Sequence, residues 1–206
     1  MNSALALANY FIKTAIDKGL AGRDFPPSKV HGLVYLAHGW LLGSAGAAIV
    51  RGAIMADKDG IFLPELKDAG CWGTKNVTQL VFLVEMDEKR GLMVEHTPQI
   101  APGNPTASAL DWVWKTYGTL SSFKIGEHIK ESGSPWEKVW HDPARKGDEP
   151  RPVANPAIRA WFRGLTSKRE EQSHTSKLNK TQQLELHPKV DEPIEWLSQF
   201  APKRNK

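Results

Sequence analysis

One segment of the chain is apolar around most of a helical circumference, and this segment constrains the fold more than any other feature. Over residues 28–42 the apolar side chains recur at helical spacing, and aromatic and aliphatic neighbours widen the stripe. The stripe and its flanks are Val30, Leu33, Val34, Tyr35, Leu36, Ala37, Trp40 and Leu41. Because such a helix must be covered on most sides, the sequence predicts a central helix in a mainly helical body. Two prolines precede it, and Ser28 is its expected N-cap.

Helical periodicity and glycine stops predict further helices around the central one. Apolar residues recur every three to four positions over residues 4–20, and the stretch LPELKDAG is typical of a short helix closed by Gly70. A helix over 121–131 fits between two glycines, with Phe123, Ile125 and Ile129 on its apolar side.

Three further helix starts share one capping chemistry. Asn104-Pro105, Ser134-Pro135 and Asn155-Pro156 each place an N-cap side chain before a proline, which has no N–H to leave unsatisfied. They predict helices at 105–117, 135–140 and 156–164. Ser134 also has Glu137 three residues later, which is the spacing of a capping box.

Two segments show strand character. Residues 77–86 and 91–100 are rich in β-forming residues and are separated by a polar DEKR stretch, which predicts a small β-hairpin on the helical body. Residues 47–63 fit either a strand or a short buried helix. The predicted fold is therefore mainly α, a compact multi-helix domain with a small β-hairpin.

The composition changes after Gly164, which predicts how the chain is organised. Residues 1–165 form the expected helical domain, and residues 166–190 form a polar linker. Residues 191–206 form a short C-terminal segment, in which Trp196 and Phe200 are spaced to share one helical face.

Charge and cysteine content limit the classes of protein. The single cysteine, Cys71, excludes an internal disulfide framework and favours a cytoplasmic location. No run approaches the ~18 apolar residues of a membrane span, the N-terminus lacks a signal-peptide pattern, and no membrane contact is expected. The net charge of +4 permits nucleic-acid binding but does not indicate it.

The titratable residues form no recognisable catalytic or metal-binding motif. His31 and His38 lie seven residues apart on the central helix without further ligands, and Cys71 has no evident base beside it. These residues are therefore expected to be structural, with no catalytic residues, no metal and no cofactor. An enzyme would require a polar pocket that joins distant residues such as His38, His128 and Glu65.

Several stretches, in the same order along the chain, resemble the Panacea-domain family, which includes SocA-like antitoxins and GepA-like phage-associated proteins. They are ALANYFIKTAIDKGL, PPSKVHGLVYLAHGW, AIMADKDGIFLPEL, LSSFKIGEHIKESGSPWEKVW and NPAIRAWF. The resemblance covers residues 4–164 and departs from the family pattern at two places. Gly32 stands where the family has a lysine, and Ile61-Phe62 follow Gly60 where the family has Pro-Val. The hairpin segment lies outside the resembling stretches.

The resemblance implies a Panacea-like domain that acts as an antitoxin and neutralises a co-encoded toxin by direct binding, without catalysis. The expected partner is this cognate toxin, with a protease as a second partner where a relative acts as an adaptor. The chain could instead be a phage-associated regulator or a DNA-binding regulator. One of the pair Trp112 and Trp114 is expected on the surface, because residues two apart on a helix face different ways. The candidate partner-binding residues are Gly60, Ile61, Phe62, Glu65, Trp112 and Trp196.

Overall fold

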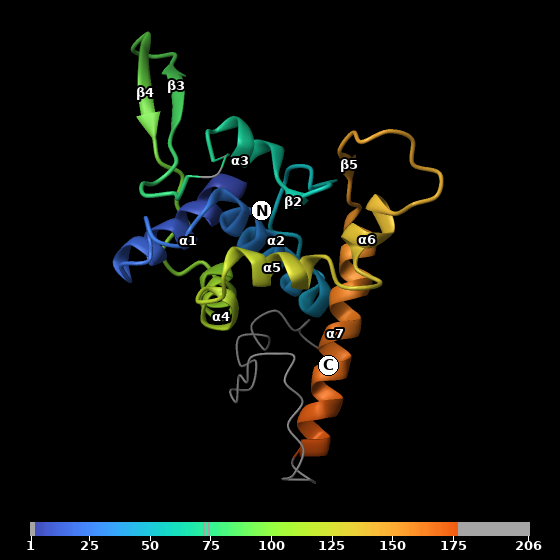
Figure 1. Ribbon diagram of the computed structural model, residues 1–206. Helices are drawn as coiled ribbons and strands as arrows, with labels where there is room; N and C mark the ends of the chain where they lie inside the picture. Colours follow the sequence, from blue (N-terminus) through green and yellow to red (C-terminus); the bar gives the residue numbers. More distant parts are fainter. Residues whose placement is uncertain (1–2, 72, 74, 177–206) are drawn as a thin grey trace, which may run out of the picture.

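The computed structural model describes residues 3–71, 73 and 75–176. These residues form seven helices and five short strands, which confirms the prediction of a mainly helical fold with a small hairpin (Figure 1). In chain order the elements are α1 (Ala4–Asp17), α2 (Pro27–Ala45), β1 (Met55–Asp57), β2 (Gly60–Phe62), α3 (Pro64–Asp68), β3 (Leu83–Asp87), β4 (Leu92–His96), α4 (Thr106–Tyr117), α5 (Ser122–Ile129), α6 (Pro135–Trp140), β5 (Arg151–Pro152) and α7 (Asn155–Ser176).

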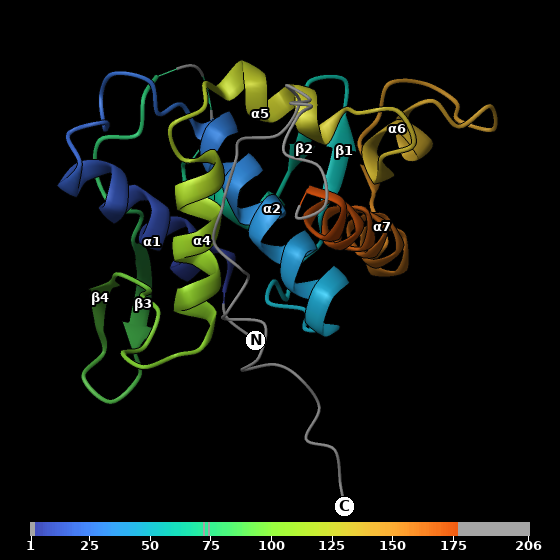
Figure 2. The same ribbon diagram turned by 90° about the horizontal axis from the view of Figure 1, so that it is seen from below.

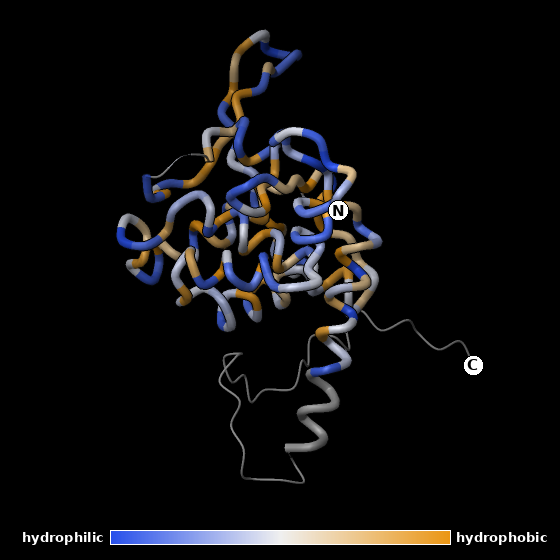
Figure 3. Tube along the Cα trace, turned by 45° about the vertical axis from the view of Figure 1, so that its right-hand side comes forward, coloured by the Kyte–Doolittle hydropathy of each residue, from blue (hydrophilic) through white to orange (hydrophobic). Residues whose placement is uncertain are grey.

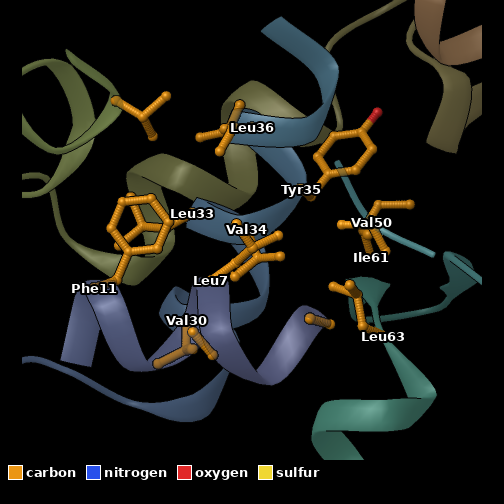
Figure 4. Close-up of a cluster of buried hydrophobic side chains, with 14 of the residues drawn as sticks. Leu7, Phe11, Val30, Leu33, Val34, Tyr35, Leu36, Val50, Ile61 and Leu63 are labelled. Atoms are coloured by element: carbon orange, nitrogen blue, oxygen red, sulfur yellow. The ribbon is translucent and has the colours of Figure 1, made fainter. Parts of the chain in front are cut away.

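Helix α2 is the central element, as its apolar circumference predicted. Seen from below, α1 and α4 lie on one side of it and α7 lies on the other (Figure 2). Leu7 and Phe11 of α1 pack with Val30 and Val34 of α2 in the buried cluster (Figure 4). The core therefore forms around one helix that is contacted by at least four others.

Two glycines allow α7 to approach α2 closely. A Cβ at Gly39 would lie 2.1 Å from Cε2 of Phe162, and a Cβ at Gly43 would lie 2.8 Å from the main-chain nitrogen of Arg163. The helix continues through Gly43 to Ala45, and Gly46 ends it in the left-handed conformation with φ of 69°. The glycines of α2 thus serve helix packing, and the helix extends three residues beyond the predicted end at residue 42.

The ambiguous segment at 47–63 contains two short antiparallel strands, and no single strand or helix. Met55 pairs with Phe62 and Asp57 pairs with Gly60, while β5 pairs with the other edge of β1. The Oδ1 atom of Asp57 accepts hydrogen bonds from the main-chain N–H groups of Asp59, at 2.9 Å, and Gly60, at 3.0 Å. These side-chain hydrogen bonds form a turn that reverses the chain between β1 and β2. Apolar periodicity does not predict such local hydrogen bonds.

The predicted cap at Ser134 is confirmed, because Ser134 Oγ accepts from Glu137 N at 3.1 Å. At α4 the N-cap is Pro105 and not Asn104 as predicted, although Asn104 Oδ1 accepts from Thr106 N at 2.9 Å. In a capping box the Glu137 carboxylate would accept the N–H of Ser134. Here it accepts the N–H of Gly133, one residue earlier, and the Ser134 N–H donates to Glu131 O.

Two other predicted caps are wrong. Helix α2 begins at Pro27 with Pro26 at the N-cap, and no side chain caps it. The Oδ1 atom of Asn155 accepts a hydrogen bond from Nε2 of the buried His38, at 3.0 Å. The Asn155 side chain therefore binds a residue 117 positions away, and it does not form the predicted cap.

Helix α7 is longer than the predicted 156–164 and continues past Gly164 to Ser176. Thr166 Oγ1 donates to Phe162 O at 2.9 Å, and Ser167 Oγ donates to Arg163 O at 3.2 Å. The polar side chains of this turn are thus compatible with a helix. Gly164 lowers the stability of the helix by only about 1 kcal/mol relative to alanine. Positions 177–190 of the predicted linker and the segment 191–206 lie outside the described residues.

Candidate protein-binding surface

The β3–β4 hairpin stands away from the helical body (Figure 1), and hydrophobic residues alternate with hydrophilic segments along it (Figure 3). Met86, Leu92 and Met93 are each 60–64% exposed, and Val84 and Val94 are also exposed. Neighbouring apolar residues face opposite sides of a strand. The hairpin therefore presents apolar groups on both of its faces.

The strand register assigns each side chain to one face. Val84 pairs with Glu95, and Met86 pairs with Met93; we name these four residues the methionine face. The alternating pairs form the other face, which we name the carboxylate face. It consists of Leu83, Glu85, Asp87, Leu92, Val94 and His96.

Asp87 organises the turn at the tip of the hairpin. Its Oδ1 atom accepts from Lys89 N at 3.0 Å and from Arg90 N at 3.3 Å. Gly91 follows with φ of 62°, and its N–H donates to Asp87 O at 2.7 Å. The polar stretch predicted between the strands thus forms a turn closed by hydrogen bonds.

Asn9 of α1 anchors the base of the hairpin. Its Nδ2 group donates to the carbonyl oxygens of Val81, at 2.8 Å, and Pro98, at 2.9 Å, and its Oδ1 accepts from Val81 N at 2.8 Å. Val81 precedes β3 and Pro98 follows β4, so one buried amide connects both ends of the hairpin to the body. Asn9 is thus a positioning residue for the exposed strands.

A second anchor lies upstream of β3. Asn76 Oδ1 accepts from Phe25 N at 3.0 Å, and Asn76 Nδ2 donates to Arg23 O at 3.1 Å. Val77 N donates to Phe25 O at 2.8 Å. The chain that enters the hairpin is therefore attached to the body at residues 76–77 and again at residue 81.

Gly60, Ile61 and Phe62, which were expected at a partner surface, are buried in strand β2. The sheet register places Ile61 against Ala56, and Lys67 Nζ lies 5.5 Å from the centre of the Phe62 ring. Glu65 is half-buried, and its Oε2 accepts from Ala4 N at 3.3 Å. Substitutions here would therefore lower stability, so they are a poor test of an interface.

The expectation that Trp112 or Trp114 is exposed is wrong, because they are 6% and 5% exposed. Trp112 meets Trp40 edge to face, with ring centres 5.2 Å apart, and Trp114 stacks on Phe11 at 6.5 Å. Helix α4 packs against both α1 and α2, so both tryptophans are covered. Trp196 lies outside the described residues.

The buried histidines have structural partners. His31 Nδ1 accepts from Leu63 N at 3.1 Å while its Nε2–H donates to Cys71 O at 2.9 Å. His38 Nδ1 accepts from Val50 N at 3.3 Å while its Nε2–H donates to Asn155 Oδ1. Desolvation by burial lowers the pKa of both imidazoles. The two histidines thus attach the segment 50–71 to α2 in their neutral form.

The residues that an enzyme would need to bring together make separate contacts. His38 is bonded to Asn155, His128 Nδ1 lies 2.9 Å from Glu131 Oε1, and Glu65 binds the start of α1. Burial raises the pKa of the Cys71 thiol to about 11, which disfavours the nucleophilic thiolate. Within residues 3–71, 73 and 75–176, no group of three or more histidine, cysteine, aspartate or glutamate side chains could hold a metal ion.

Gly32 has a packing role in this chain. A Cβ at Gly32 would lie 2.6 Å from Cγ2 of Ile125, so any larger side chain at this position would force Ile125 of α5 to shift. Sequence reasoning did not identify the exposed residues of the hairpin as contacts. The signal for them was the apolar run Leu92-Met93-Val94 at the start of β4, since such runs are typical of strands buried on both faces.

Comparison with known proteins adds no relative: no family model, no curated protein and no solved structure matches the chain. Across the part of the chain that the structure describes, no helix has the length and apolar character needed to cross a membrane.

Proposed function

We propose that this protein is an antitoxin that neutralises a co-encoded protein toxin by direct contact, and that the β3–β4 hairpin provides the contact surface. The observation that carries the proposal is the apolar exposure of the hairpin, where Met86, Leu92 and Met93 are each at least 60% exposed. Exposed apolar groups grouped in this way are typical of protein–protein contact sites.

The division of the chain into a body and a hairpin supports this proposal. The stretches that resemble the Panacea family supply the body, in which Asn9, Lys29, Trp40 and Trp136 are buried. Lys29 Nζ donates to Asp24 O at 3.1 Å, and Trp40 Nε1 donates to the Tyr117 hydroxyl at 3.1 Å. The hairpin lies outside these stretches. The body therefore acts as a scaffold, and the hairpin provides specificity for the toxin.

The proposed mechanism needs no reacting group in this chain. Neutralisation requires only that the hairpin covers a surface on which the toxin depends, and its affinity then follows from the apolar area buried at the contact. The buried histidines and Cys71 have a structural role in this proposal, since they hold the segment 50–71 against α2.

The test is a growth-rescue experiment with the neighbouring gene. This gene is expressed alone and together with the wild-type chain, with the Met86→Thr/Met93→Thr variant, or with Phe123→Thr. Phe123 is the matched control, because it is 70% exposed on α5, away from the hairpin. We expect the neighbour alone to arrest growth, and we expect rescue by the wild type and the control but not by the hairpin variant.

Two outcomes would contradict different parts of the proposal. A neighbour that is harmless when expressed alone would refute the antitoxin function. Full rescue by the hairpin variant would leave the antitoxin function standing but would move the contact surface elsewhere. The melting temperatures of all variants are measured in parallel, since a loss of rescue counts only if the fold is intact.

A further inference from the structure

Among the residues that the structure describes, none covers the apolar side chains on either face of the hairpin. Leu92, Met93 and Val94 are consecutive, exposed and apolar, and alternate residues of a strand point to opposite sides. Continuous apolar runs are typical of strands that are buried on both faces, whereas a half-covered strand alternates apolar and polar residues. The sequence of β4 is therefore suited to an enclosed strand.

Hairpin geometry also favours an enclosing partner. A two-stranded hairpin is marginally stable by itself in water, and this one is joined to the body through its base at Asn9. Its sheet has the order β3-β4, so the outer side of each strand is an edge with main-chain groups available for pairing. A partner that surrounds the hairpin can cover these edges as well as the faces.

The charge of the hairpin indicates the chemistry of its partner. Residues 82–97 contain four acidic and two basic side chains, a net charge of −2 in a chain whose total is +4. Glu95 lies on the methionine face, and Glu85 and Asp87 lie on the carboxylate face. The basic side chains Lys89 and Arg90 lie in the turn.

This distribution disfavours a second copy of the hairpin as the partner. Two hairpins in contact would bring their carboxylates together, and like charges across an interface oppose association. Lysine or arginine side chains on a different protein would satisfy the carboxylates of both faces.

We infer that the partner is a basic protein whose binding cleft encloses the hairpin on both faces, with apolar walls against Met86, Met93, Leu92 and Val94 and cationic side chains opposite Glu85 and Glu95. This inference rests on the proposed function only in taking the product of the neighbouring gene, the expected toxin, as the partner.

The experiment measures the affinity of the purified neighbouring-gene product for four forms of the chain, each compared with the wild type, by titration calorimetry. Met86→Thr/Met93→Thr changes the methionine face, and Leu92→Thr/Val94→Thr changes the carboxylate face. Glu85→Gln/Glu95→Gln removes one charge from each face, and Phe123→Thr is the control. All substituted residues are exposed, so the melting temperatures should stay close to that of the wild type.

We expect each apolar pair to weaken binding roughly tenfold or more, because both faces lose buried contacts. The charge variant should bind about tenfold more weakly at low salt, and this difference should shrink at high salt. The control should bind like the wild type.

Several results would overturn the inference. A loss of affinity from one apolar pair only would mean that the hairpin lies flat on its partner. Unchanged affinity of the charge variant would refute a cationic cleft, and hairpin-dependent dimers in sedimentation would identify a second copy as the occupant. Absence of any binding by the wild-type chain would refute the inference together with the direct-contact antitoxin mechanism.

The two proposals can fail separately. If growth rescue works while binding is insensitive to every hairpin variant, the antitoxin function stands and the enclosed hairpin does not. If the neighbouring product is harmless but binds with the expected dependence on both faces, the enclosed hairpin stands and the antitoxin function does not.

Discussion

The side-chain amide of Asn9 pairs with the main chain of Val81 through both of its polar atoms, donating to the carbonyl oxygen and accepting from the N–H, each at 2.8 Å. This pairing imitates the hydrogen bonding of a neighbouring strand, although Asn9 belongs to a helix 72 residues away. The same amide reaches the carbonyl oxygen of Pro98, so one buried side chain contacts both ends of the exposed hairpin.

Replacing Asn9 by leucine should therefore destabilise the protein and loosen the hairpin. The change leaves the N–H and carbonyl of Val81 and the carbonyl of Pro98 without their side-chain partner, at about 1–3 kcal/mol for each buried group. We expect a loss of about 3 kcal/mol or more in the free energy of unfolding, measured by urea denaturation. Amide exchange in β3 and β4 should also accelerate. Lys13→Gln on the exposed side of α1 is the control, and equal effects of the two changes would contradict the anchoring role.

Protein stability should fall as the solution is acidified below neutral pH. Burial lowers the folded-state pKa of His31 and His38 from the usual value of 6.5, so the folded state favours the neutral imidazoles. Their contribution is fully present above pH 6.5 and is lost as the pH falls towards the folded-state pKa values. Near His31, Lys67 opposes protonation and Asp57 favours it.

The pH prediction is tested by the urea midpoint between pH 7.5 and about 5.5, a range chosen to limit carboxylate titration. We expect the midpoint to decrease through this range. Imidazole NMR signals of His31 and His38 should keep their neutral positions below pH 6.5. A midpoint that rises on acidification would refute this account, as would early protonation of either ring.

Gly39→Ala should destabilise the contact between α2 and α7. The new methyl group would lie 2.1 Å from the Phe162 ring, and overpacking of this kind costs about 1–3 kcal/mol or more. Because the obstacle is a side chain, Phe162→Leu should restore part of the loss in the double variant. Gly43→Ala should not be rescued in this way, since its methyl group would also meet the main chain of α7.

The matched control for the glycine variants is Gly126→Ala in α5. No atom beyond its own helix and chain neighbours lies within 4 Å of a Cβ at this position, so the substitution should stabilise the helix by about 0.5–1 kcal/mol. Thermal unfolding of the four single variants, Phe162→Leu included, and of the double variant measures these differences. Additive effects of Gly39→Ala and Phe162→Leu would contradict the proposed contact.

Tyr35→Phe should leave the stability unchanged or increase it. The Tyr35 ring is buried edge to face with Phe162, and among the described residues its hydroxyl has no hydrogen-bond partner. Removing the hydroxyl keeps the ring contact and relieves the cost of burying a polar group, which is about 1 kcal/mol or more.

Tyr10→Phe provides the comparison for this prediction. The Tyr10 hydroxyl donates to Asp111 Oδ1 at 2.6 Å in an exposed position, so its removal should destabilise the protein by about 0.5 kcal/mol. Denaturant unfolding of both variants distinguishes the two cases. A large loss for Tyr35→Phe would show that its hydroxyl has an essential partner.

Sequence patterns predicted the positions of the helices and strands better than they predicted which side chains are buried. Periodicity located α1, α2 and α5, prolines with polar caps located α4 and α6, and the β-forming runs located the hairpin. These signals are local, because capping bonds and apolar stripes involve residues within one or two turns. Phe123 shows the limit, since it belongs to the predicted apolar side of α5 and yet is 70% exposed.

The sequence by itself determined that α2 would be central, because a helix that is apolar around most of its circumference must be covered on most sides. Only the tertiary structure decided that Trp112 and Trp114 would both be covered, that β2 would be buried, and that the apolar hairpin would stay uncovered. The physical reason is that burial depends on which surfaces meet, and those surfaces come from segments far apart in the chain. Asn9 illustrates this rule, because its role follows from Val81 and Pro98 and from nothing in its own helix.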